Sequence, residues 1–161
     1  WPTCRARGRL CSRQAARFAR WSAGISARAL VALSKAGSEV LMFGQSFVDK
    51  TISLLVRGQD TEAAVAALER EFVDDKEHGV VRQITVQRPV ASVSVVGAAA
   101  DDSFSLASRT FAALGKHRTP VLSIAQAYSE YNVTFVVPQE VVDETVCLIH
   151  AELGLGRGGT Q

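Results

Sequence analysis

Hydrophobic residues in the second half of the chain change their spacing several times, and each change predicts a new element. Val90–Val96 alternates apolar residues with Ser92 and Ser94, which is typical of a half-buried strand. Apolar residues then recur at helical spacing in Leu106–Leu114 and again in Val142–Leu153, with two β-rich runs between them. The predicted order is a strand at 90–96, a helix that ends before Pro120, strands at 121–125 and 132–137, and a helix at 142–153.

The first half of the chain repeats this order. Its pattern predicts a helix from Ile25 to about Ala36, strands at 40–44 and 51–56, and a helix that runs from an N-cap at Asp60 or Thr61 to Phe72. The charged residues 74–79 are expected to form a linker. Residues 80–86 are expected to form a strand that either completes the first half or pairs with the second. The helix residues expected in the core are Ala64, Val65, Leu68, Phe72, Ala107, Phe111 and Leu114.

A shift of 81 positions superimposes the two halves without a gap between residues 28 and 72. Ten residues in this stretch are identical to their partners, among them Arg28 with Arg109 and Gln45 with Gln126. Many other pairs keep their chemical character. We interpret this self-similarity as a duplicated domain.

Each copy orders its elements as strand, helix, strand, strand, helix, which is the split βαβ arrangement of ferredoxin-like folds. The predicted class is α+β, with two tandem βαββαβ domains whose antiparallel sheets carry their helices on one face. We expect domains at 23–87 and 88–155, between a basic, disordered head at 1–22 and a flexible tail at 156–161. Residues 9–15 do not resemble a core strand, so the opening strand of the first copy is expected to be lost or displaced towards Arg17–Trp21.

Charge is divided unevenly along the chain. The first 38 residues contain eight basic residues and no acid, whereas the residues from Glu39 onward contain ten basic and sixteen acidic residues. The acidic body argues against nucleic acid as a partner. No apolar run is long enough to span a membrane. Three cysteines without CxxC spacing and three scattered histidines predict neither a disulfide scaffold nor a metal site.

Two segments, 40–56 and 121–137, resemble the ACT motif of aspartokinases. Each reads as a strand that ends in a glutamine, Gln45 or Gln126, followed by a short polar turn and a second strand rich in β-branched residues. The resemblance extends over roughly four-fifths of the chain. It is closest to the threonine-sensitive aspartokinases, including those fused to homoserine dehydrogenase.

The resemblance implies a regulatory role. In this family the paired domains associate between subunits and bind an end-product amino acid, threonine or lysine, at their interfaces. Occupancy biases an attached kinase, which phosphorylates the side-chain carboxylate of aspartate with ATP, towards an inactive state. The implied partners are an amino-acid effector, further copies of the chain and a kinase domain. ATP and magnesium would belong to that kinase domain, and no cofactor is expected in this chain.

The resemblance also implies which residues contact the effector. Gln45 and Gln126 match the family's effector-binding glutamine, whose amide can both donate and accept hydrogen bonds. A helix N-terminus after the first strand would offer backbone N–H groups to the effector's carboxylate. The full set of candidate effector-binding residues is Gln45, Gln126, Asp49, Ser129, Glu130, Asn132, Gly24 and Ile25.

Other interpretations stay open at this point. The polar turn residues could simply be solvated, and the loop at 97–105 lacks the later glycine, the methionine and the proline that are usual in the family. A degenerate tandem that only dimerises is therefore the alternative function, and a fragment without an independent role is a third. No catalytic motif is present, and the glycines at 154–159 follow a predicted helix, which favours a tail over a nucleotide loop. The expected location is cytoplasmic, or plastid if the basic head is a transit-peptide remnant.

Overall fold

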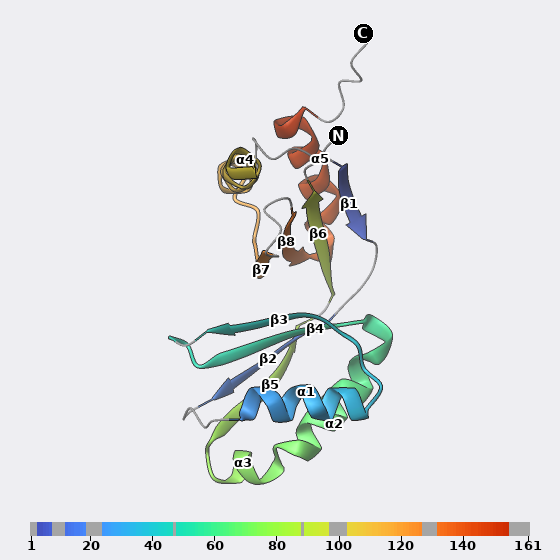
Figure 1. Ribbon diagram of the computed structural model, residues 1–161, viewed down its shortest axis with the longest axis vertical. Coiled ribbons are helices and arrows are strands. Elements are labelled where there is room, and N and C mark those ends of the chain that lie inside the picture. Colours follow the sequence, from blue (N-terminus) through green and yellow to red (C-terminus); the bar gives the residue numbers. More distant parts are fainter. Residues whose placement is uncertain are drawn as a thin grey trace. The chain divides into compact units, whose positions relative to one another are not determined.

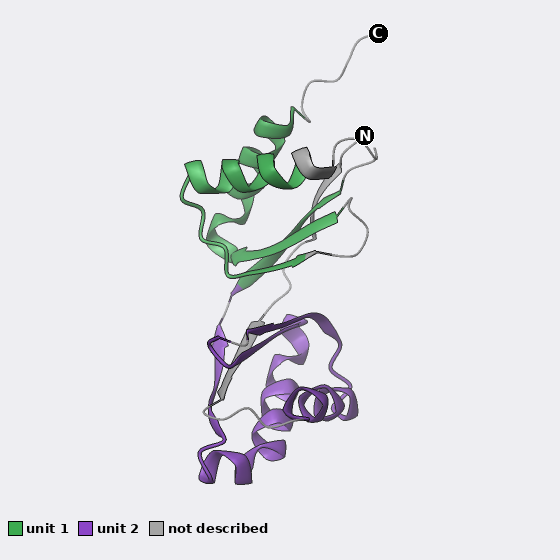
Figure 2. Ribbon diagram, turned by 60° about the vertical axis from the view of Figure 1, so that its left-hand side comes forward, with its two compact units in different colours: residues 1–9, 90–161 green, residues 10–89 purple. Residues whose placement is uncertain are grey.

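The computed structural model describes residues 3–7, 12–18, 24–46, 48–87, 89–96, 103–126 and 132–154. The chain divides into two compact units, coloured separately in Figure 2. Unit 1 comprises residues 1–9 and 90–161, and unit 2 comprises residues 10–89. The chain therefore begins in unit 1, passes through unit 2 and returns to unit 1.

Unit 2 is built on a four-stranded antiparallel sheet in the order β3-β4-β2-β5. Helices α1 and α2 lie on the same side of this sheet, as Figure 1 shows. The strands are β2 (Ser12–Phe18), β3 (Val40–Ser46), β4 (Thr51–Val56) and β5 (Val81–Gln87), and the helical elements are α1 (Ile25–Lys35), η1 (Gly58–Asp60), α2 (Thr61–Glu71) and α3 (Val73–Glu77).

Unit 1 has the corresponding sheet in the order β1-β6-β8-β7, again with every neighbouring pair antiparallel. Its helices α4 and α5 cover one face of the sheet (Figure 2). The strands are β1 (Thr3–Arg7), β6 (Val90–Val96), β7 (Ser123–Gln126) and β8 (Asn132–Pro138), and the helical elements are α4 (Ser103–Lys116), η2 (Gln139–Val141) and α5 (Val142–Leu153).

Each core lies between the sheet and its two helices, as the apolar spacing requires. In unit 2, Ile25, Ala29 and Leu33 of α1 recur at helical spacing and are buried against alternate residues of β4. The turn after α1 ends the helix with the backbone N–H of Ser38 bonded to the Leu33 carbonyl at 3.0 Å and with Gly37 at φ 69°. The predicted α+β class with tandem ferredoxin-like domains is confirmed.

The register of the strands also confirms the duplication. Gln45 lies opposite Ile52 in the β3–β4 pair, and Gln126 lies opposite Val133 in the β7–β8 pair. These four residues are related by the same shift of 81 positions. The two β-turn-β segments that carry the resemblance are therefore equivalent hairpins.

The opening strand of the first copy was expected to be either lost or displaced; it is present, and it starts three residues later than residues 9–15, where the repeat would place it. Residues Ser12–Phe18 form β2, which pairs with β4 on one side and β5 on the other. Thr3–Arg7 forms β1, which pairs with β6 in unit 1. Strands thus occupy part of the segment that was expected to be a disordered head. Pairing with neighbouring strands, rather than the local sequence, makes these residues β-structure.

Three smaller expectations are also corrected. The charged stretch expected as a linker contains helix α3, Val73–Glu77. Asp60 occupies the predicted N-cap position of α2, but no side-chain hydrogen bond caps the helix. Phe111, expected in the core, is 38% exposed, whereas Leu114 of the same helix is buried. Helical spacing identifies the side of a helix that faces the core but not how deeply each residue is buried.

The strand at Val81–Gln87 completes unit 2, because β5 pairs with β2. This resolves the choice between completing the first copy and pairing with the second. The extent of the tail at 156–161 lies outside the described residues.

Candidate functional site

The candidate site in unit 2 joins the start of α1 to the end of β3. Ser26, in the first turn of α1, donates a hydrogen bond from its Oγ to Oε1 of Gln45 at 3.3 Å. Gln45 is exposed and lies on an edge strand, opposite the buried Ile52. Directly opposed residues of an antiparallel pair project to the same face, so Gln45 lies on the helix-covered face of the sheet. The hydrogen bond therefore fixes an exposed amide beside a helix N-terminus.

The N-terminus of α1 has backbone donors without a capping side chain. Gly24 is the N-cap residue in the left-handed conformation, with φ 97°, and no side chain in the described part of the chain caps the helix. The first intrahelical bond runs from the Arg28 N–H to the Gly24 carbonyl at 2.8 Å. The N–H groups before it have no partner within the helix, as in any first turn. No acidic residue occurs in this turn, so the site favours a negatively charged group.

Ile25 contributes to this site through its backbone. Its side chain is only 4% exposed and belongs to the core of unit 2. The predicted contact between Ile25 and an effector is therefore restricted to the peptide group, and any change of its side chain would act on packing.

Asp49 lies in the turn that joins β3 to β4. Its Oδ2 accepts a hydrogen bond from Ser46 Oγ at 3.2 Å, while its own N–H donates to the same hydroxyl at 3.3 Å. Thr51 Oγ1 also donates to the Asp49 carbonyl at 3.1 Å. These contacts give Asp49 a clear structural role in holding the turn.

Two exposed apolar side chains accompany Gln45. Phe43 precedes it by two residues on the same face of β3 and is 39% exposed, and Leu30 follows Ser26 by one helical turn and is 38% exposed. Because α1 and β3 are joined by a short connection and run in opposite directions, Leu30 and Phe43 lie on the same side of the site. The surface beside the edge strand β3 is thus apolar at Leu30 and Phe43 and polar at Ser26 and Gln45.

Unit 1 repeats only part of this arrangement. Gln126 ends the edge strand β7, in the register position equivalent to Gln45. Phe111 and Ile124 are exposed, as are their equivalents Leu30 and Phe43. The position of Ser26 is occupied by Ala107, which has no hydroxyl to bind the glutamine.

The remaining predicted residues of the second copy are not brought together with Gln126. Asn132 lies opposite Val96 and accepts a hydrogen bond from Thr134 Oγ1 at 3.4 Å. Its neighbour Val133, opposite Gln126, belongs to the core. Successive strand residues alternate between faces, so Asn132 and Gln126 occupy register positions on opposite faces. Ser129, Glu130 and the side chain of Gln126 lie outside the described residues.

A cluster that the sequence analysis missed connects α1 to α2 and α3 in unit 2. The Arg28 guanidinium bonds the Glu71 carboxylate at 2.7 Å, the Glu71 carbonyl at 2.9 Å and the Asp75 carboxylate at 2.8 Å. It also lies 4.9 Å from the ring centroid of Phe72. The hydrogen bond to Asp75, and then that to Glu71, holds the pKa of Arg28 above its ordinary value.

The equivalent arginine of unit 1 makes part of the same contact. Arg109 donates to the backbone carbonyl of Glu152. The signal for this cluster was present in the sequence, because Arg28 with Arg109 and Glu71 with Glu152 are both identical pairs in the repeat. In both units the identical arginine and glutamate form a contact between two helices, from the guanidinium to the glutamate carbonyl.

Other kinds of site find no support in the part of the chain that the structure describes. Its His, Cys, Asp and Glu residues form no group of three that could hold a metal ion. None of its helices is long and apolar enough to cross a membrane.

Comparison with protein families shows what the two units are similar to. The model of the ACT domain matches twice, at residues 20–72 and 93–153. The bifunctional aspartokinase/homoserine dehydrogenase of Haemophilus influenzae is 32% identical over 130 residues, which cover 81% of this chain and 16% of that protein. The chain therefore spans about a sixth of the length of this curated relative.

Solved structures share the fold at lower sequence identity. The ligand-free regulatory subunit of aspartate kinase from Thermus thermophilus has a TM-score of 0.78 and 17% identity, covering 94% of this chain and 97% of that one. Aspartokinase III of E. coli, in complex with lysine and aspartate in its T-state, has a TM-score of 0.61 and 17% identity, covering 94% of this chain and 32% of that one. The resemblance drawn from the two hairpins is confirmed.

Proposed function

Because the chain belongs to the ACT domain family, we propose that it is the regulatory region of an aspartokinase and that it binds a free amino acid, threonine or lysine. The hydrogen bond between Ser26 and Gln45 is the observation that carries this proposal. It positions an exposed amide beside uncapped N–H groups on the edge of a sheet. No catalytic residue is assigned within this chain.

The chemistry of a free amino acid fits this arrangement. Its carboxylate needs hydrogen-bond donors, which the first turn of α1 supplies together with the positive end of the helix dipole. Its ammonium or a side-chain hydroxyl needs polar partners, and the Gln45 amide can accept from one group and donate to another. Asp49 would act by holding the turn after β3 rather than by contacting the effector.

We also propose that copies of the chain associate through these edges. The β3 edge carries the exposed Leu30 and Phe43, and the β7 edge carries Phe111 and Ile124. Edge strands present unpaired backbone groups, and an apolar border beside them favours pairing with another chain. Association would also exclude water from an effector bound at the edge.

Regulation then follows from linkage. An effector that binds more tightly to one arrangement of the regulatory units shifts the protein towards that arrangement by the difference in binding free energy. In the full-length protein, a kinase domain would use ATP and magnesium to phosphorylate aspartate, and the bound effector would favour its inactive state.

Calorimetric titration of the folded chain with threonine, lysine and methionine tests the proposal. We expect heat with threonine or lysine, and about tenfold weaker binding for Gln45→Ala or Gln126→Ala, whichever copy binds, with the melting temperature nearly unchanged. Equal loss of affinity and melting temperature would mean that the glutamine is structural.

The alternative function is a dimerisation scaffold that has lost its effector. The replacement of Ser26 by Ala107 in the second copy favours this alternative for unit 1. A chain that sediments as a dimer but gives no heat with any of the three amino acids would establish the scaffold and exclude the sensor.

A further inference from the structure

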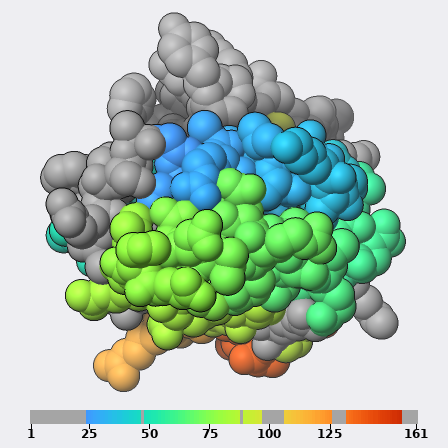
Figure 3. Space-filling model, turned by 90° about the horizontal axis from the view of Figure 1, so that it is seen from below, coloured from blue at the N-terminus to red at the C-terminus, as the bar shows by residue number. Residues whose placement is uncertain are grey.

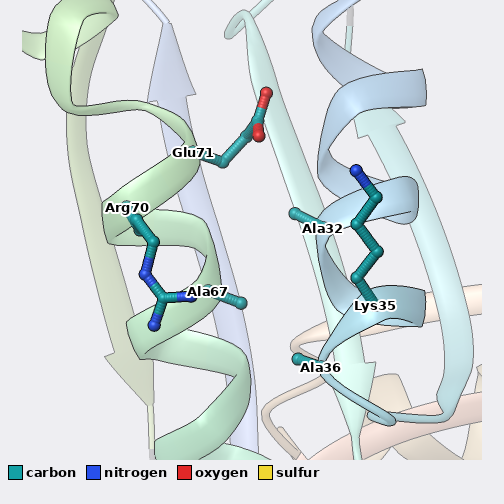
Figure 4. A pocket seen from close by; sticks show the side chains of 6 residues that line it. All are labelled: Ala32, Lys35, Ala36, Ala67, Arg70 and Glu71. Carbon is teal, nitrogen blue, oxygen red and sulfur yellow. The ribbon is translucent and has the colours of Figure 1, made fainter.

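A cleft of about 230 Å³ opens between α1 and α2 on the helical side of unit 2. Figure 3 shows this side of the unit, with α1 in blue and α2 in green. The side chains that line the cleft are drawn in Figure 4 and come from both helices. They are Ala32, Lys35, Ala36, Ala67, Arg70 and Glu71.

The duplicated unit carries larger side chains at two of the positions that line the cleft. The shift of 81 positions puts Leu148 where unit 2 has Ala67, and His117 where it has Ala36. Leu148 is half-buried on α5 of unit 1. Unit 2 thus lacks two large side chains at positions where the other copy of the fold accommodates them.

Two cations border the cleft. Lys35 and Arg70 make no ion pair with any described residue, and in Figure 4 Lys35 lies along α1 and Arg70 along α2. The Glu71 carboxylate also lines the cleft, but it already accepts a 2.7 Å hydrogen bond from Arg28. The local charge therefore favours an anion.

The helix dipoles favour the two cations beside the cleft but do not account for both. Lys35 and Arg70 both lie in the last turn of their helices, where cations are favoured. In unit 1 the residue equivalent to Lys35 is also a lysine, Lys116, whereas the residue equivalent to Arg70 is Ala151. Arg70 is thus particular to unit 2, which also carries the small side chains that line the cleft.

We propose that this cleft binds a small organic dianion, a short dicarboxylate or an alkyl phosphate. The apolar body would lie on the alanine floor, and the anionic groups would meet Lys35 and Arg70. The volume is below the range of about 300–1,000 Å³ usual for drug-sized ligands, so the ligand is short. This site is separate from the proposed effector site, which uses the other end of α1.

Amide chemical shifts of the complete folded chain test the proposal. Succinate, propyl phosphate and inorganic phosphate are titrated at constant ionic strength. We expect millimolar binding of one or both organic dianions, with shifts in the second half of α1 and in α2. Succinate alone would indicate a dicarboxylate site, and propyl phosphate alone an alkyl phosphate site.

Variants that copy the residues of the other unit separate this site from general anion binding. Ala67→Leu should abolish the shifts, whereas the matched change Leu148→Ala in unit 1 should leave them. Arg70→Gln, which leaves the cleft open, should weaken binding about tenfold while the spectrum stays dispersed. Threonine or lysine heats should be the same for Ala67→Leu and wild type, so the two sites can fail independently.

Two results would overturn the proposal. One is inorganic phosphate producing the same shifts as the organic dianions with equal affinity, which would show that the alanine floor contributes nothing. The other is binding that survives both Ala67→Leu and Arg70→Gln.

Discussion

Units 1 and 2 use one backbone plan but differ in the side chains between and beside their helices. In unit 2, Ser26 binds Gln45 and Arg28 reaches two carboxylates. In unit 1, Ala107 replaces the serine, and Arg109 contacts the Glu152 carbonyl. The hairpin registers are identical in the two units. Duplication has therefore preserved what builds the sheet and altered what a ligand would contact.

The largest expected effect distinguishes the two cores. Phe72 is 1% exposed in unit 2, whereas its equivalent Leu153 only packs at the border of the unit 1 core. We expect Phe72→Ala to lower the free energy of unfolding by about 3–5 kcal/mol, because it removes a buried aromatic side chain. Leu153→Ala should lower the free energy of unfolding by less, because Leu153 is only partly buried.

Denaturant unfolding followed by circular dichroism measures this difference. Two units need not unfold together, and where two transitions are resolved the first variant should move only the one that belongs to unit 2. Equal shifts for both variants would contradict the difference in burial.

How far the sequence predicted the fold depends on the element. Apolar spacing located α1, α2, α4 and α5 and both hairpins, since a helix or strand buried on one face leaves its period in the sequence. It failed for β2, whose Ser-Arg-Gln-Ala-Ala-Arg sequence has little apolar alternation. That strand is specified by its two neighbours. It also failed for α3, a five-residue helix of four charged residues and one valine that has no apolar stripe.

The site shows a similar limit. Gln45 could be placed at the end of its strand because the motif lies within one hairpin. Ser26 is 19 residues away on another element, and only the packing of α1 against the sheet brings it to Gln45. Arg28 and Glu71 are 43 residues apart, so their shared identity in the repeat indicated importance but not contact.

Phe111→Ala is expected to have the next largest effect on the free energy of unfolding, and it tests the exposed edge of unit 1. Its side chain is 38% exposed, so we expect a loss of about 1–2 kcal/mol rather than the full cost of a buried aromatic. If copies of the chain associate through this edge, the loss should increase with protein concentration. Thermal unfolding at several concentrations measures both quantities, and a loss near about 4 kcal/mol in the monomer would contradict the observed exposure.

Arg28→Ala and Arg109→Ala compare the helix contacts of the two units. Arg28→Ala removes two ion pairs, a hydrogen bond to a carbonyl group and a contact with Phe72. The Arg28 side chain is 43% exposed, however, so solvent screens these charge interactions. We expect a cost of about 1 kcal/mol, and about half of that for Arg109→Ala. The difference in unfolding free energy should shrink in about 1 M salt, because the carboxylate contacts are screened. An unchanged difference would assign it to packing against Phe72.

The smallest expected effect bears most directly on function. Ser26→Ala removes the hydroxyl that holds Gln45, so unit 2 acquires the local chemistry of unit 1, and we expect about threefold weaker effector binding at unit 2. The reciprocal change Ala107→Ser should strengthen binding at unit 1 only if the Gln126 side chain can reach the new hydroxyl. Ser26 lies in the first turn of α1 and is only partly buried, so Ser26→Ala should not move the melting temperature appreciably. Ala107 lies further along α4 and packs against the core of unit 1, so the melting temperature of Ala107→Ser is measured alongside its affinity. Titration calorimetry on the two single variants and the double variant therefore asks whether one hydroxyl accounts for the difference between the copies. If Ser26→Ala leaves the affinity unchanged in a chain that binds effector, the Ser26–Gln45 contact does not position the amide for binding.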